Sequence, residues 1–411
     1  MTQHHARLIA VAIAAVSFSP PITAQQEPTS PPTFEALVET LGGGFRGGHE
    51  NEQGEVVIVD LSLPRVTDAH LAHLAGLTAL EMLFLDGTQV TGPGLAHLTG
   101  LTALAGLNLG RTQVTDAGLA HLAGLTGLRQ LVLNGTAITD AGLAHLMGLA
   151  ALFSLNLVDT QVTDAGLAHL TELPALTELY LAGTQVTDAG LAHLAGLTGL
   201  KQLVLNGTAI TGPGLAHLTG LTALEELRLG GTQVTNAGLA HLAGLTALET
   251  LALRDPGITD AGLVHLAGLT GLKQLVLNGT AITGPGLAHL TGLTALEELR
   301  LGGTQVTDAG LAHLAGLTGL KQLILNGTAI TDAGLAHLAG LTALEHLYLR
   351  GTQVTDAGLA HLTGLAALEF LTLLRTQVTD VGVAELQTAL PNCSIETYED
   401  AIAPPPPPPP Q

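Results

Sequence analysis

Aromatic, cysteine and basic residues are all scarce in this chain. Its 411 residues include no Trp, and Phe, Trp and Tyr together make up 2%. The apolar 46% is mostly Leu, Ala and Val, so a core must be built from many similar small contacts. A single cysteine, Cys393, excludes an intrachain disulfide. With 13 Lys and Arg against 34 Asp and Glu, the formal net charge is -21, which argues against a nucleic-acid partner because phosphate binding depends on basic clusters.

The two ends of the chain differ in composition from its middle. Residues 1–24 combine Arg7, the apolar run Leu8–Val16 and the small-residue site before Gln25, a pattern typical of a secretory signal peptide. Residues 25–52 are predicted to form a linker and N-terminal cap, with Thr33 capping a short helix to about Leu41. Residues 396–411 form a proline-rich tail. The signal-peptide pattern predicts an exported protein, periplasmic or extracellular. No later apolar run is long enough for a membrane helix, so we expect no membrane span.

The middle of the chain is a repeat. From Leu77 to Leu365 the sequence restarts every 24 residues, as in Leu101–Gly124, with the consensus L-T-x-L-x-x-L-x-L-x-G-T-x-V-T-D-A-G-L-A-H-L-x-G. Its L-x-x-L-x-L core resembles the leucine-rich repeat, and its T-D-A-G-L ending is similar to repeats of bacterial leucine-rich-repeat proteins and of F-box-associated receptors. The resemblance covers about residues 53–395. It implies an α/β solenoid, a leucine-rich-repeat horseshoe with a concave parallel sheet and short convex helices.

Each repeat can be divided into a strand and a helix. Alternation places Leu107 and Leu109 on a buried face of a short strand and their neighbours on an open face. Asp116 is predicted to cap a helix of about two turns that turns Leu119 and Leu122 inward. We also expect the hydroxyl of Thr112 and of its counterparts to hydrogen-bond the backbone of the next coil. The segment Asp255-Pro256-Gly257 interrupts the pattern and predicts a local irregularity.

No catalytic constellation is recognisable, so we expect no enzyme activity and no cofactor. Two repeated columns could instead suggest metal binding. The Asp column includes Gly and Asn at equivalent positions, which are good helix caps and poor calcium ligands. The His column, from His73 to His361, could bind Zn²⁺ or Ni²⁺ across coils, or be a solvent-facing position copied with its repeat. Inward-pointing leucines beside each His favour the second interpretation, and we predict no metal site.

The open strand face differs between copies and is where the resembled family usually binds. Tyr and Arg are frequent in binding hot spots, whereas scattered apolar residues are normal on any surface. Ordinary surface variation therefore remains the alternative explanation for these differences. The candidate binding residues are Tyr180, Arg228, Arg300, His346, Tyr348, Arg350 and Phe370.

A duplication complicates the choice of one site. Leu197–Gly244 and Leu269–Gly316 are identical except for Asn236 against Asp308, so Arg228 recurs as Arg300. Either a repetitive partner is bound, or copying has outpaced specialisation. The sequence favours a non-enzymatic exported scaffold that binds a protein or polysaccharide partner on its concave face. The alternatives are a substrate receptor in ubiquitin-ligase-type degradation, or an enzyme with an unrecognised site.

Overall fold

The computed structural model describes residues 34–41 and 48–397, which form two compact units divided between Leu152 and Phe153. The predicted signal peptide and most of the proline-rich tail lie outside these residues. Both units repeat one theme: a three-residue strand, a turn, and a short helix. Within each unit we describe the elements in chain order.

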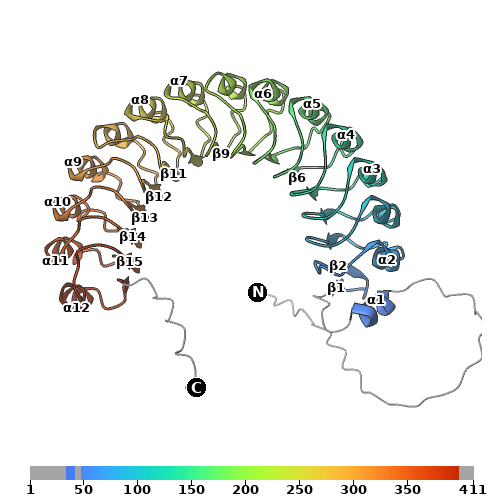
Figure 1. The fold of residues 1–411 in the computed structure, drawn as a ribbon, viewed down its shortest axis with the longest axis horizontal. Helices are drawn as coiled ribbons and strands as arrows, with labels where there is room; N and C mark the ends of the chain where they lie inside the picture. Colours follow the sequence, from blue (N-terminus) through green and yellow to red (C-terminus); the bar gives the residue numbers. More distant parts are fainter. Residues whose placement is uncertain (1–33, 42–47, 398–411) are drawn as a thin grey trace, which may run out of the picture. The chain divides into compact units, whose positions relative to one another are not determined.

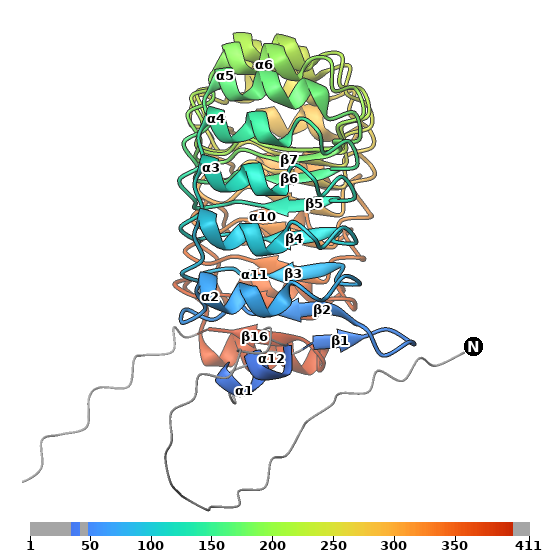
Figure 2. The same cartoon turned by 90° about the vertical axis from the view of Figure 1, so that its right-hand side faces the viewer.

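The first unit holds a sheet capped by a hairpin. Its strands are β1 (Gly48–Glu50), β2 (Val56–Asp60), β3 (Met82–Phe84), β4 (Gly106–Asn108) and β5 (Gln130–Val132). Its helices are α1 (Phe34–Leu41), α2 (Asp68–Leu71), η2 (Ala72–Leu74), η3 (Gly92–Leu98), α3 (Asp116–Leu119), η4 (Ala120–Leu122), α4 (Asp140–Leu143) and η5 (Ala144–Leu146). β1 pairs antiparallel with β2, whereas β2 to β5 are parallel. Figure 2 shows these strands stacked in chain order, with α2, α3 and α4 on one side of them.

The second unit continues the theme over more coils. Its strands are β6 (Ser154–Asn156), β7 (Glu178–Tyr180), β8 (Gln202–Val204), β9 (Glu226–Arg228), β10 (Thr250–Ala252), β11 (Gln274–Val276), β12 (Glu298–Arg300), β13 (Gln322–Ile324), β14 (His346–Tyr348), β15 (Phe370–Thr372) and β16 (Ser394–Glu396). All neighbours among them pair in parallel. Within this unit the strands line the inner side of an arc and the helices its outer side (Figure 1).

Half of the helical segments of the second unit are a single α turn continued by a 3₁₀ turn. They are α5 (Asp164–Leu167), η6 (Ala168–Glu172), α6 (Asp188–Leu194), η7 (Pro213–Leu218), α7 (Asn236–Leu239), η8 (Ala240–Leu242), α8 (Asp260–Leu263), η9 (Val264–Leu266), η10 (Pro285–Leu290), α9 (Asp308–Leu311), η11 (Ala312–Leu314), α10 (Asp332–Ala336), α11 (Asp356–Leu359), η12 (Ala360–Leu362) and α12 (Asp380–Ala389). Pro213 and Pro285 stand first in their helices, where a missing N–H leaves no bond unmade.

The core of each coil is a layer of leucines contributed by the strand and the helix. In the coil of β4, Leu109, Leu119 and Leu122 are fully buried and Leu107 is 2% exposed. The predicted strand and helix faces are therefore confirmed, as is the helix that follows Thr33. The fold is an α/β solenoid of the leucine-rich-repeat type, as the sequence predicted.

The prediction for the repeated threonine is wrong. The Thr112 hydroxyl donates to the Leu109 carbonyl of its own coil at 2.6 Å, and most equivalent threonines do the same, whereas the buried Thr88 hydroxyl has no hydrogen-bond partner among the described residues. The three-residue offset explains this, because the turn brings the hydroxyl back to the carbonyl of the residue that directly follows the strand. This threonine therefore closes its own turn, and the next coil is held by another residue.

The prediction that Asp116 caps its helix is also wrong. Thr115, in extended conformation, occupies the N-cap and Asp116 is the first helical residue. The Asp116 carboxylate instead accepts two hydrogen bonds from the next coil, from the Thr139 N–H at 2.8 Å and from the Thr139 hydroxyl at 2.6 Å. We call this contact the Asp–Thr pair. It recurs 23 residues apart along both units, for example in Asp308 and Thr331.

The glycine of each D-A-G triplet makes room for the pair. A Cβ on Gly334 would collide with the Asp308 carboxylate and lie 2.9 Å from Ile330 Cγ2. Where Gly284 replaces the aspartate, the following Gly310 approaches its backbone, and a Cβ on Gly284 would lie 3.1 Å from Gly310 Cα. Coils therefore contact through a carboxylate or directly through backbone, and both arrangements require glycine.

Candidate functional site

The side chains on the open face of the second unit come from the outward positions of its strands. Strand register aligns Val204, Arg228, Ala252, Val276 and Arg300 in one row across β8 to β12. Parallel strands are about 4.8 Å apart, so Arg228 and Arg300 are separated by about 14 Å of sheet. The short side chains of Ala252 and Val276 lie between the two long arginines, and the surface is therefore depressed at this point.

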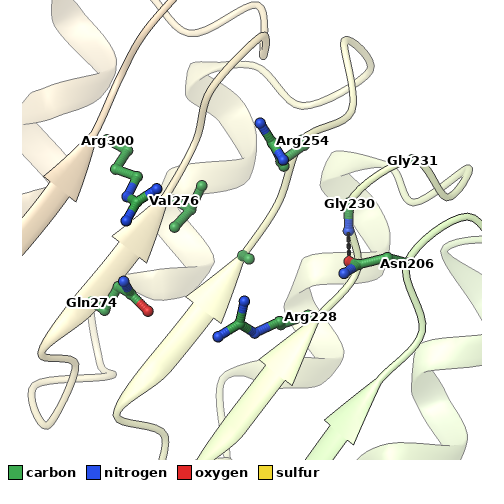
Figure 3. A pocket seen from close by; sticks show the side chains of 9 residues that line it. Asn206, Arg228, Gly230, Gly231, Arg254, Gln274, Val276 and Arg300 are labelled. Atoms are coloured by element: carbon green, nitrogen blue, oxygen red, sulfur yellow. Dashed lines mark hydrogen bonds between the residues drawn. The ribbon is translucent and has the colours of Figure 1, made fainter. Parts of the chain in front are cut away.

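This depression is a pocket of about 480 Å³. Arg228 and Arg300 stand on its two sides, with Val276 and the Ala252 strand between them (Figure 3). We call it the arginine pocket, and its lining residues are Asn206, Arg228, Gly230, Gly231, Ala252, Arg254, Gln274, Val276 and Arg300. It gathers three of the chain's 13 basic residues in a protein of net charge -21. The charged residues that line the pocket are thus all basic, although Glu226 and Glu298 beside it offset part of their charge.

Two of the arginines are held by acids on their own strands. Arg228 Nε donates to Glu226, and Arg300 Nε donates to Glu298. The acid side chains are 21% and 19% exposed, so each pair is partly sheltered from water. Gln274 Nε2 donates to Glu298 at 2.5 Å and adds a further contact beside Arg300. These bonds use Nε and fix the direction of each guanidinium.

The third arginine, Arg254, is positioned by a glycine. Its exposed side chain lies over Gly230, where an added Cβ would come within 3.0 Å of Arg254 Cδ. The Gly230 N–H donates to Asn206 Oδ1 at 2.8 Å, which leaves the Asn206 amide nitrogen as the donor at this edge (Figure 3). Within the described ranges, no carboxylate lies within ion-pairing distance of Arg254.

The irregularity predicted at Asp255-Pro256 is confirmed and adjoins the pocket. The turn residues of the adjoining coils, Gly231 and Gly279, have φ of 74° and 72°, whereas Asp255 has no positive φ. A following proline disfavours that region for Asp255. Its side chain is 4% exposed and accepts hydrogen bonds from the Thr232 hydroxyl at 3.2 Å and from the backbone of Gly231 and Thr232. Burial raises the pKa of the Asp255 carboxyl, and these hydrogen bonds oppose the rise.

A second group of predicted residues meets near the C-terminal end of the sheet. The His346 and Phe370 ring centroids are 6.5 Å apart, and those of Tyr348 and Phe370 are 5.4 Å apart. All three side chains are half-buried. Tilted rings at such distances are a favourable aromatic arrangement. We call these three residues the aromatic cluster.

The remaining candidates are separate from both groups. Tyr180 donates its hydroxyl to Gln202 Oε1 at 2.7 Å. Burial raises the Tyr180 pKa, and the Glu178 and Glu226 charges raise it further. Arg350 is exposed, and its backbone N–H donates to Asn326 Oδ1 at 2.8 Å. The structure therefore brings five of the seven predicted residues together in two places and leaves Tyr180 and Arg350 apart. Sequence reasoning missed Arg254, Asn206 and Gln274.

Charges at the edge of this face are largely paired between coils. Lys201 contacts Glu225 at 2.7 Å, Lys273 contacts Glu249 at 2.8 Å, and Lys321 contacts Glu297 at 2.7 Å. Each lysine is about half exposed, so these ion pairs contribute little to stability. These pairs neutralise part of the charge along this edge of the face.

The repeated histidines lie on the helices, half or fully exposed. Within residues 34–41 and 48–397, no three His, Cys, Asp or Glu side chains gather closely enough to share a metal ion. The same residues include no helix with the length and apolar character needed to span a membrane.

Comparison with known proteins places the fold. Residues 172–195 match the family model described as Leucine Rich repeat. An internalin (inlF) from Listeria monocytogenes is 25% identical, with a TM-score of 0.57 over 89% of this chain and 94% of that chain. A leucine-rich-repeat protein from Leptospira interrogans is 20% identical, with a TM-score of 0.55 over 82% and 95%. No curated protein matches the chain in sequence.

A receptor of the same fold has been solved with its ligand. The ectodomain of the Arabidopsis receptor kinase HAESA, in complex with an IDA peptide hormone, is 18% identical, with a TM-score of 0.54. The match covers 81% of this chain and 60% of the HAESA chain. These likenesses define a leucine-rich-repeat solenoid with bacterial structural neighbours. The resemblance to the repeats of F-box-associated receptors stays a prediction.

Proposed function

We propose that this protein is an exported, non-enzymatic scaffold that binds a protein partner on the strand face of its second unit. The aromatic cluster is the observation that carries the proposal. Elsewhere the described outward positions are small, polar or aliphatic in most coils, whereas here His346, Tyr348 and Phe370 stand together half-buried. Aromatic side chains held in place by their neighbours are typical binding anchors.

The shape of the unit supports a macromolecular partner. A strand face that extends over many coils offers area rather than a deep cleft, which suits a protein chain or a polysaccharide better than a small molecule. Leucine-rich-repeat structures bind protein ligands, as the HAESA complex with a peptide hormone illustrates. We therefore favour a protein over a polysaccharide.

The test compares binding by two variants of the full-length protein. Tyr348→Ala combined with Phe370→Ala removes two rings from the strand face. His337→Gln changes an exposed residue that directly follows α10, on the helix side of the coil. Proteins retained from the native culture medium by the unaltered chain should be lost by the double variant and kept by His337→Gln. We expect the double variant to bind the purified partner with a free energy of binding weaker by more than about 2 kcal/mol.

Two checks protect the interpretation. The double variant should keep the far-ultraviolet circular dichroism of the unaltered chain, because both rings point away from the leucine core. If the double variant retains the partner as well as the unaltered chain does, the partner does not bind at the aromatic cluster.

A further inference from the structure

We infer that the arginine pocket is a receptor for the carboxylates of an extended acidic segment in the bound partner. The inference rests on the proposed binding function and specifies the chemistry of one part of the surface. It starts from the hydrogen-bonding groups that line the pocket.

Those groups are predominantly donors. Three guanidinium groups contribute fixed positive charge, and Arg228 and Arg300 use Nε for Glu226 and Glu298. Their terminal nitrogens are the groups left for a ligand. Guanidinium groups bind carboxylates through paired, charge-assisted hydrogen bonds. Asn206 already accepts from Gly230 with its oxygen, so its amide nitrogen is a donor as well.

The pocket is formed by two sequence features acting together. The duplicated two-coil segment places Glu226–Arg228 on β9 and an identical Glu298–Arg300 on β12. Two coils lie between them, and the β10 coil is different: Ala252 has only a small side chain at the bottom of the pocket, and Asp255 is turned inward by its hydrogen bonds to Gly231 and Thr232. Arg254 is thus left on the rim without the acid that follows it in sequence. The two copies therefore border one shared pocket.

The spacing selects an extended peptide. Arg228 and Arg300 are about 14 Å apart across the sheet, and side chains four residues apart on an extended chain are about 13 Å apart. Acidic residues at such positions reach both arginines, while a residue between them lies over Ala252 and Val276, which are 7% and 9% exposed. A long uniformly anionic polymer is disfavoured, because the chain around the pocket contributes to a net charge of -21.

The probe is a fluorescein-labelled heptapeptide in which glutamate alternates with alanine, and fluorescence anisotropy measures its binding to the full chain. We expect binding that weakens with added salt, and about 10-fold weaker binding to Arg254→Gln or to Arg228→Gln with Arg300→Gln. Arg129→Gln, an exposed substitution in the first unit, is the matched control and should bind like the unaltered chain. The same peptide with glutamine for glutamate should not bind.

Competition identifies the anion. Unlabelled acidic peptide should displace the probe at lower concentration than sodium sulfate or a double-stranded DNA of equal charge. Equal binding of the glutamate and glutamine peptides, preferential displacement by DNA, or unchanged binding by the arginine variants would overturn the inference. The two proposals can be distinguished. If the partner is lost by the Tyr348→Ala and Phe370→Ala variant but still bound by both arginine variants, the proposed function is supported and the role of the arginine pocket is contradicted.

Discussion

Asp308 and Thr331 lie on successive coils and are joined twice, because the Thr331 N–H donates to Oδ1 at 2.8 Å and its hydroxyl donates to Oδ2 at 2.6 Å. One carboxylate thereby satisfies two groups at the start of the next helix. Asn236 does the same with an amide, accepting from the Thr259 N–H at 2.9 Å and donating to its hydroxyl at 2.7 Å. Contact between coils thus depends on the geometry of this side chain more than on its charge.

Replacing the acid in one pair should separate geometry from charge. Asp332→Ala leaves the Thr355 N–H and hydroxyl without their acceptor, and we expect it to lower the free energy of unfolding by about 1–3 kcal/mol. Asp332→Asn should retain most of the stability, because Asn236 makes the equivalent bonds natively. Urea midpoints from circular dichroism provide the measurement. Equal losses in the two variants would contradict this account.

The glycine beside each pair should not tolerate a methyl group. In Gly334→Ala the new Cβ displaces the Asp308 carboxylate and presses on Ile330, so we expect a loss of about 1–3 kcal/mol despite the better helix propensity of alanine. Gly340→Ala is the control, since nothing lies within 4 Å of its Cβ position. Thermal unfolding should separate the two variants clearly. A Gly334→Ala midpoint at or above that of Gly340→Ala would show that the coils can move apart freely.

One pair should make stability depend on pH at the acid end. Hydrogen bonds from the Thr379 hydroxyl and N–H lower the Asp356 pKa below 3.8, its ordinary value. The stabilisation is therefore present above pH 3.8 and is lost as the pH falls from there through the folded-state pKa. Asp356→Asn should show a smaller fall in thermal midpoint over that interval than the unaltered chain. Parallel pH profiles for the two proteins would mean that Asp356 contributes nothing to acid unfolding.

Export should be visible at the N-terminus. The basic residue, apolar run and small-residue site before Gln25 predict cleavage there, so the mature chain should begin near Gln25. Intact-mass measurement of the protein from its native host provides the test, with the same chain made in a cytosolic expression system as the uncleaved reference. A native protein that begins at Met1 or Thr2 would overturn the prediction.

The sequence predicted the solenoid because each leucine column depends only on local alternation and on the 24-residue period. It did not predict the Asp–Thr pair, since a residue that starts a helix has the same sequence signature as one that caps it. The arginine pocket was missed for a different reason. Arg254 reaches the rim only because Gly230 has no side chain and Asp255 turns inward, and these contacts join separate coils.

The constant spacing of the Asp–Thr pair has a consequence for how such a chain can change length. Because the partner is 23 residues away in each of these pairs, removing or inserting one complete 24-residue module that carries the aspartate joins it to an equivalent threonine. A module with glycine at that position, like that of Gly284, keeps its backbone contact instead. Unequal exchange between near-identical modules therefore alters copy number without leaving a broken junction. An exchange between β9 and β12 also changes the distance between Arg228 and Arg300, so the number of modules between them sets the spacing of the ligand groups that the two arginines share.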